Sequence, residues 1–114
     1  MSLDIALYVD VDTGAPTVTR LVIPGSDANI THNVIPMWQL AGVYDALYNS
    51  DGTHAGDWVG ALRVGVADMQ DRPATYEVLN PPNGWGRYGT ALRFLEAWTG
   101  MCAAHPTALI EVSK

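Results

Sequence analysis

Two short polar stretches hold the residues that could bind a ligand. The first, NITHN at residues 29–33, places two carboxamides, a hydroxyl and an imidazole just before an apolar run containing Pro36. A proline suits the first turn of a helix, where the leading amides have no acceptor within the helix. Thr31 or Asn33 could cap these amides. Such a cap accounts for one polar side chain and leaves the others unexplained.

The functional hypothesis for this stretch is recognition of an anion or a carbonyl group by the helix amides, with Asn29, His32 and Asn33 selecting the ligand. An unperturbed histidine titrates at about pH 6.5, so His32 could act as a general base, a donor or a metal ligand. The alternative is a solvated loop, because asparagine and histidine are common in turns.

The second stretch is NGWGRY at residues 83–88. Two glycines flank Trp85, so the backbone could approach a ligand closely beside a flat ring available for stacking. Arg87 could meet a carboxylate or phosphate. With Asn83 and Tyr88, these residues would form the edge of a pocket for a nucleotide-like or aromatic molecule. The alternative is a loop whose tryptophan packs on the core, since tryptophan is usually largely buried.

The remaining chemistry is sparse. Asp10 and Asp12 could offer carboxylates to a divalent cation, but the further acids and closing glutamate of a calcium loop are missing. No nucleophile-elbow serine, phosphate loop or HExxH spacing is present. Cys102 is expected to be a small core residue. We therefore expect neither a metal nor a cofactor.

The composition indicates one acidic globular domain spanning residues 1–114. Apolar residues make up 48% of the chain and charged residues 16%, which suits a single core. The net charge is −6 and the six basic residues are scattered, which argues against nucleic-acid binding. No signal sequence or membrane-spanning stretch is recognisable, and one cysteine suits a reducing compartment. We expect a cytoplasmic protein that does not contact membranes.

Hydrophobic periodicity predicts the elements that position the two stretches. Residues 3–11 alternate, turn formers occupy residues 12–16, and residues 17–23 are β-branched, which together predict an N-terminal hairpin. Residues 24–28 break the second strand and lead into the first polar stretch. Residues 107–113 alternate again and predict a third strand.

Apolar residues at helical spacing fill the region between these strands. The predicted helices run from Pro36 to near Asn49, from a cap at Asp51 or Thr53 to Arg72, from Ala74 to Leu79, and from Tyr88 to before Pro106. The buried stripes are Val59, Leu62, Val66 and Met69 in the second helix, and Tyr88, Ala91, Leu92, Leu95, Trp98, Thr99 and Cys102 in the last.

This order predicts an α+β fold, in which a small antiparallel sheet of about three strands, the N-terminal hairpin plus the C-terminal strand, packs against three or four helices. In the second helix, Gly60 and Gly65 each cost stability, and could allow a close helix crossing.

Both polar stretches also resemble segments of other proteins. The pattern NxTHNxxPMW at residues 29–38, followed by NGWGxY at residues 83–88, resembles a group of short uncharacterised proteins from bacteria and their phages. The resemblance spans most of the chain. It implies a natural, intracellular, single-domain protein and carries no known activity.

Three functions are compatible with these features. The first is a ligand-binding protein in which both stretches form one pocket for a polar, nucleotide-like molecule. The second is a structural or protein-interaction module, phage-encoded and homodimeric, in which Trp38, Trp58 and Trp85 serve packing and an interface. The third is a hydrolase with His32 as general base near Asp10 or Asp12. Whether the protein is an enzyme stays open at this point.

Overall fold

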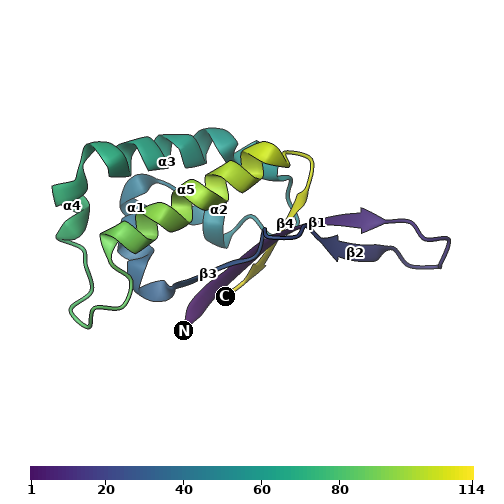
Figure 1. Ribbon diagram of the computed structural model, residues 1–114, viewed down its shortest axis with the longest axis horizontal. Helices are drawn as coiled ribbons and strands as arrows, with labels where there is room; N and C mark the ends of the chain where they lie inside the picture. Colours follow the sequence, from purple (N-terminus) through teal and green to yellow (C-terminus); the bar gives the residue numbers. More distant parts are fainter.

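The computed structural model describes residues 1–114 as a four-stranded antiparallel sheet with helices gathered on one of its faces (Figure 1). The strands are β1 (Ser2–Val11), β2 (Thr19–Val22), β3 (Ala28–Thr31) and β4 (Leu109–Ser113). The helices are α1 (Ile35–Ala41), α2 (Tyr44–Tyr48), α3 (Val59–Asp71), α4 (Pro73–Glu77) and α5 (Tyr88–Ala104), with 3-10 turns η1 (His32–Val34) and η2 (Ala55–Trp58). The predicted α+β class is confirmed.

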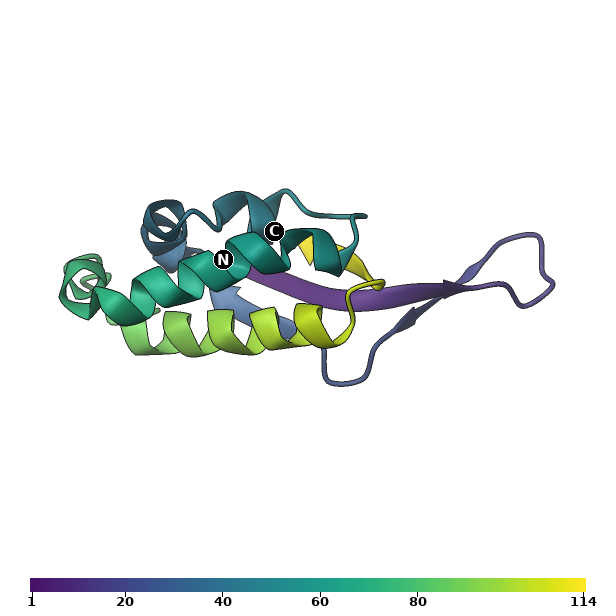
Figure 2. The same ribbon diagram turned by 90° about the horizontal axis from the view of Figure 1, so that it is seen from above.

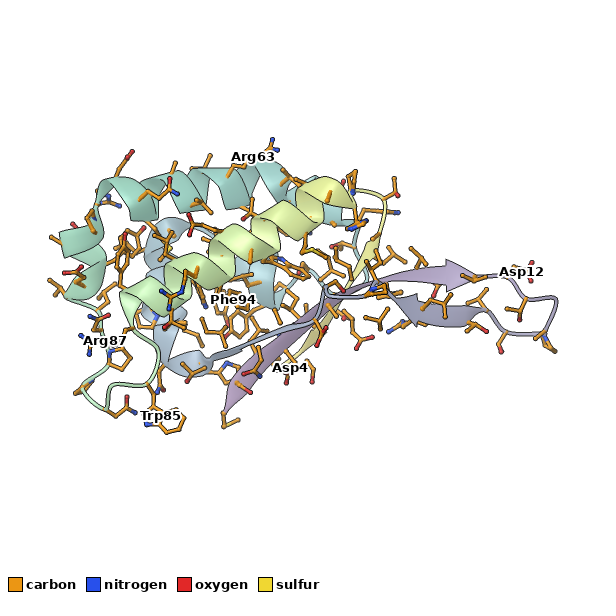
Figure 3. All side chains as sticks on the ribbon, viewed as in Figure 1. Asp4, Asp12, Arg63, Trp85, Arg87 and Phe94 are labelled. Carbon is orange, nitrogen blue, oxygen red and sulfur yellow. The ribbon has the colours of Figure 1, made fainter.

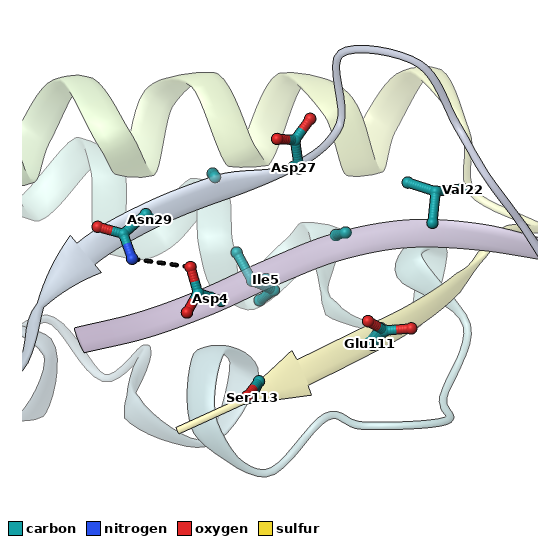
Figure 4. Close-up of a pocket in the computed structure, with 9 residues that line it drawn as sticks. Asp4, Ile5, Val22, Asp27, Asn29, Glu111 and Ser113 are labelled. Atoms are coloured by element: carbon teal, nitrogen blue, oxygen red, sulfur yellow. Dashed lines mark hydrogen bonds between the residues drawn. The ribbon is translucent and has the colours of Figure 1, made fainter. Parts of the chain in front are cut away.

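The long first strand organises the sheet, because each of the other strands pairs with it in antiparallel orientation. Residues 2–5 pair with β3, residues 4–8 pair with β4, and residues 8–11 pair with β2. Figure 4 shows β3 and β4 on either side of β1. The sheet has four strands where about three were expected, because β3 forms in the segment expected to be a break and a loop.

A buried serine in the connection between β2 and β3 bonds this segment to β1. The segment between these strands turns at Pro24 and Gly25, and Ser26 then points back at β1, where it is 1% exposed. Its hydroxyl accepts from the Leu7 amide at 3.0 Å and donates to the Leu7 carbonyl at 3.2 Å. The Leu7 carbonyl also accepts from the Ile23 amide at 2.8 Å, so Ile23 and Ser26 together satisfy both backbone groups of Leu7 between the pairings with β2 and β3.

The hydrophobic core lies between the helices and one face of β1. Its strand members are Leu3, Ile5 and Leu7 of β1, all 2% exposed or less, together with Ile30 of β3 and Ile110 of β4. Large side chains from the helices fill the rest of this core, among them Met37, Trp38, Leu47, Leu62, Met69, Tyr76, Leu95 and Trp98. The predicted stripes of the second and last helices face this core.

The helix predicted from Pro36 to near Asn49 is divided into α1 and α2. Gly42 has a φ of 76°, a left-handed conformation that glycine adopts without strain and that ends α1. Val43 is then buried against α3 at Gly65, where an added Cβ would lie 2.3 Å from Val43 Cγ1. The close crossing expected at Gly65 is confirmed, while nothing lies within 4 Å of a Cβ at Gly60.

The caps expected for the second helix serve other contacts. η2 precedes α3, and its N-cap residue, His54, makes no side-chain cap hydrogen bond. The Thr53 hydroxyl accepts from Trp58 Nε1 at 2.8 Å and donates to the Ser50 carbonyl. Asp51 Oδ1 instead accepts from the Val112 amide of β4 at 2.8 Å. Asp51 therefore attaches the loop to the sheet, Thr53 links the loop to η2, and neither side chain caps α3.

The hairpin of β1 and β2 projects from the body of the molecule, as Figure 2 shows from above. We call residues 9–22 the arm. Its exposed apolar side chains are Val9, Val18, Leu21 and Val22, between 38% and 59% exposed. The sheet is two-stranded here, and no helix covers it (Figures 1 and 2). The molecule measures 53 × 27 × 21 Å as a result. None of the helices is long and apolar enough to cross a lipid bilayer.

Candidate ligand-binding cleft

The two polar stretches of the sequence meet in the structure. β3 and η1 carry the first stretch, and the loop before α5 carries the second. The contact is made at Gly86, where an added Cβ would lie 2.4 Å from Thr31 Cγ2 and 2.7 Å from Val34 Cγ1. The convergence required by the shared-pocket hypothesis is therefore present.

Strand pairing and a short cap hold the first stretch. Ser2 pairs with Thr31 and Asp4 pairs with Asn29, so these four side chains share one face of the sheet. Asn29 Nδ2 donates to Ser2 Oγ at 3.0 Å and to Asp4 Oδ1 at 2.8 Å. The Thr31 hydroxyl accepts from the Asn33 amide at 3.2 Å and caps η1, so the predicted capping role belongs to Thr31.

Side-chain hydrogen bonds also order the second stretch. Asn83 Oδ1 accepts from the Trp85 amide at 3.0 Å, and Asn80 Oδ1 accepts from the Tyr88 amide at 2.8 Å at the start of α5. Gly84 and Gly86 have φ values of 76° and 84°, which favour glycine at both positions. The loop presents Trp85 at 70% exposure, next to the start of β1 in the view of Figure 3.

A cleft of about 600 Å³ lies between these segments. Five of the predicted site residues line it, namely Asn29, Thr31, Asn33, Asn83 and Trp85. The rest of the lining is Met1, Ser2, Ile30, Gly86 and Thr90. The alternative that Trp85 packs onto the core does not hold, because this residue is 70% exposed and lines the cleft.

Three predicted site residues are not part of the lining. Nδ1 of His32 is hydrogen-bonded to the Tyr48 hydroxyl at 2.8 Å. Tyr88 donates its hydroxyl to the Met69 carbonyl at 2.6 Å, which fixes α5 against α3. Arg87 is exposed and makes no side-chain hydrogen bond or ion pair, and Figure 3 shows it higher on the loop than Trp85. The cleft therefore lacks the imidazole and the cation expected of it.

The carboxylates considered for a hydrolase lie far from His32. Thr31, the neighbour of His32, pairs with Ser2 at the beginning of β1. Asp10 lies eight residues further along the same strand, which corresponds to about 27 Å. Asp12 follows in the exposed turn of the arm, which Figure 3 labels at the opposite end of the molecule. The geometry does not form the pair of groups that this hypothesis needs.

Sequence reasoning missed Ser2 and Thr90 as members of the cleft. Ser2 reaches it only because β1 pairs with β3 in a register that places it opposite Thr31. Thr90 lies in the first turn of α5, directly after the second polar stretch. The helical periodicity of residues 88–104 places Thr90 on the side of the helix opposite the buried stripe. This position predicts that the Thr90 side chain is exposed.

A second hollow of about 330 Å³ lies on the sheet, across β3, β1 and β4 (Figure 4). Three carboxylates line it, those of Asp4, Asp27 and Glu111. Glu111 is paired with Arg20 at 2.9 Å, and Asp4 accepts from Asn29. No group of three or more acidic, histidine or cysteine side chains is arranged to hold a metal ion.

No titratable group with a perturbed pKa lines the cleft. Arg72 and Tyr76 both hydrogen-bond to Asp68, and these contacts lower the pKa of the Asp68 carboxyl. Burial, followed by the hydrogen bond to Asp68, raises the pKa of Tyr76 to about 12. Cys102 is a core residue, as expected, and its burial raises the pKa of the thiol to about 12. None of these groups is among the residues that line the cleft.

Comparison with protein-family models, with curated proteins and with solved structures found no match to this chain. The resemblance to short bacterial and phage proteins stays a prediction, and function is inferred from the cleft itself.

Proposed function

We propose that this protein binds a small, neutral, polar molecule in the cleft between β3, η1 and the loop before α5. The observation that carries the proposal is the chemistry of the lining. Three carboxamides and three hydroxyls surround one exposed indole, and no charged side chain is among them. The volume falls within the range of about 300–1,000 Å³ that is typical of small-molecule sites.

The absence of charged side chains from the lining favours one class of ligand over another. A phosphate or carboxylate would lose hydration on entering the cleft and find no cationic side chain to compensate. The net charge of −6 adds a general repulsion of anions. These two facts favour a neutral ligand over the nucleotide-like molecule that Arg87 had suggested.

The test is to map binding onto backbone amide NMR signals with a panel of neutral sugars, nucleosides, polyols and simple amides. We expect at least one class to shift the signals of Asn33, Trp85 and Gly86 and leave those of the arm unchanged. A bound compound present at a hundred times its dissociation constant should also add about 2.7 kcal/mol to the free energy of unfolding.

A pair of variants separates binding from folding. The Asn33 side chain is exposed and makes no hydrogen bond within the protein, so Asn33→Ala should change stability by less than about 0.5 kcal/mol and weaken binding. Asn49→Ala is the matched control, because Asn49 is exposed and hydrogen-bonds only to Asp45, outside the cleft. If no compound of the panel perturbs the cleft signals, the proposed function is wrong.

The arm favours a second candidate function, self-association of two copies. Val9 pairs with Leu21 and Asp10 pairs with Arg20, so Val9 and Leu21 lie on the face of the arm opposite these charged side chains, whereas Val22, which pairs with Tyr8, lies on the charged face. Two copies could pack their uncharged faces without bringing like charges together, despite the net charge of the chain. An isolated two-stranded hairpin is marginally stable in water, so contact with a second copy would stabilise the arm.

A further inference from the structure

Some polar atoms in the cleft lining make no hydrogen bond within the protein and are free to bind a ligand. Asn29 uses its amide nitrogen on Ser2 and Asp4, which leaves its carbonyl oxygen as a free acceptor. Asn83 uses its carbonyl oxygen on the Trp85 amide, which leaves its nitrogen as a free donor. The two carboxamides therefore offer opposite functions to a ligand.

The other polar groups can both donate and accept. The Asn33 carboxamide and the Thr90 hydroxyl make no hydrogen bond within the protein. The Thr31 hydroxyl accepts from the Asn33 amide and keeps its proton to donate. A ligand that matches this set needs several groups that each donate and accept, and hydroxyl groups have this property.

The indole of Trp85 supplies the apolar surface. It is the only aromatic ring in the lining, so it can cover one flat face of a ligand. The other apolar side chains of the lining are Met1 and Ile30, and Ile30 is only 4% exposed. Asn29, Asn33, Asn83 and Thr90 are exposed as well, so the opposite face of a bound molecule would stay in water.

This asymmetry distinguishes a sugar from a nucleobase. A base has two apolar faces and carries polar atoms only at its edges, and it gains most where both faces are covered. A pyranose ring can present one face of C–H groups and keep its hydroxyls around the edge for hydrogen bonding. One exposed indole, surrounded by neutral donors and acceptors, suits the second geometry.

We infer that the ligand of the cleft is a neutral sugar, with the C–H face of one pyranose ring on the Trp85 indole and its hydroxyls on Asn29, Asn33 and Asn83. This inference rests on the proposed binding function of the cleft, and it adds the chemical class of the ligand. Arg87 takes no part in this recognition, so phosphorylation of the sugar is not required for binding.

The experiment titrates the protein with cellobiose, maltose and N,N′-diacetylchitobiose in one arm, and with adenosine and cytidine in the other. We expect at least one disaccharide to shift the Trp85 indole N–H signal and the Asn33 amide signal, and neither nucleoside to do so. Shifts caused only by a nucleoside would overturn the sugar assignment and leave the binding function intact. Absence of any shift in both arms would overturn the sugar assignment, and the polyols and amides of the wider panel would then decide whether the binding function fails as well.

Substitutions at Trp85 test the stacking contact. Trp85→Ala should weaken sugar binding by about tenfold or more, in line with the stacking energies of flat ligands on aromatic side chains. Trp85→Phe keeps a flat ring and should retain most of the affinity. Because the side chain is 70% exposed, neither change should unfold the protein. Trp58→Phe, outside the cleft, is the control and should bind as the native chain does. Equal affinity of Trp85→Ala and the native protein would contradict the proposed pose.

Discussion

Tyr48 shows how a single side chain fixes the end of the first polar stretch. Its hydroxyl is hydrogen-bonded to His32, and its ring stacks on Tyr44 with the centroids 4.7 Å apart. Its backbone carbonyl accepts from Lys114 Nζ at 3.1 Å. Burial, and to a smaller extent the neighbouring Tyr44, raises the pKa of Tyr48 to about 12. The hydroxyl is therefore protonated in the folded chain at pH values where an exposed tyrosine ionises.

This shift predicts a loss of stability in alkaline solution. The pKa of Tyr48 is higher in the folded chain than its ordinary value of 10.0, so its contribution is complete below pH 10 and is lost as the pH rises toward 12. One such group gives a slope of up to about 1.4 kcal/mol per pH unit. Urea unfolding of Tyr48→Phe between pH 9 and 12 should show a shallower decline than the native chain, whereas parallel curves would contradict the assignment.

The position of His32 also shows what spacing alone cannot decide. Its neighbours Thr31 and Asn33 line the cleft, but η1 turns the imidazole toward Tyr48, sixteen residues later in the chain. The residue types of the stretch correctly identified a polar surface. Which of these side chains face the cleft also depends on Tyr48 of α2, which lies outside the stretch and holds the imidazole of His32.

At the scale of elements, one glycine determines how closely the loop before α5 approaches η1. Gly84 and Gly86 both have positive φ values, so replacing either by alanine introduces similar backbone strain. Only Gly86 also faces neighbours that an added Cβ would meet, while nothing lies within 4 Å of a Cβ at Gly84. A comparison of alanine substitutions at Gly84 and Gly86 therefore distinguishes the effect of backbone strain from the effect of the contact between the loop and η1.

We predict that Gly86→Ala destabilises the protein by about 1–3 kcal/mol more than Gly84→Ala, because the added methyl group must displace Thr31 or Val34. Amide NMR of Gly86→Ala should show shifted signals in η1, and Gly84→Ala should leave η1 unchanged. Equal unfolding free energies for the two variants would contradict the close packing of the loop against η1 at Gly86.

The elements that were predicted correctly have strong periodicity, and those that were missed are short. The alternation of β1 and the stripe of α5 extend over 10 and 17 residues, and both were recognised. β3 has only four residues, and its pairing with β1 supplies the order that its own pattern lacks. The division between α1 and α2 follows from the left-handed conformation of Gly42. The sequence shows a glycine at this position, but a glycine there is also compatible with one continuous helix.

At the scale of the whole molecule, the arm makes the protein more extended than its length requires. The radius of gyration is 14.9 Å, compared with about 13 Å for a compact domain of this size. The cleft and the arm lie at opposite ends of β1, so ligand binding and self-association, if both occur, use separate surfaces.

Self-association through the arm can be tested by sedimentation equilibrium. If two copies pack their arms, the native chain should dimerise as its concentration rises, and Leu21→Lys should remain monomeric because its charge would be buried in the interface. Val64→Lys is the control, since Val64 is 68% exposed on α3, away from the arm. A native chain that stays monomeric throughout the accessible concentration range would remove this second function and would not affect the cleft.

The burial of Cys102 has a practical consequence for such measurements. Its thiol is 0% exposed and its pKa is raised to about 12, so it will react slowly with maleimides and other thiol reagents. A cysteine introduced at Thr13, in the exposed turn of the arm, would be the single reactive handle on the folded chain. The protein could then be attached to a dye or a sensor surface through its arm while the opposite end stays accessible to sugars in solution.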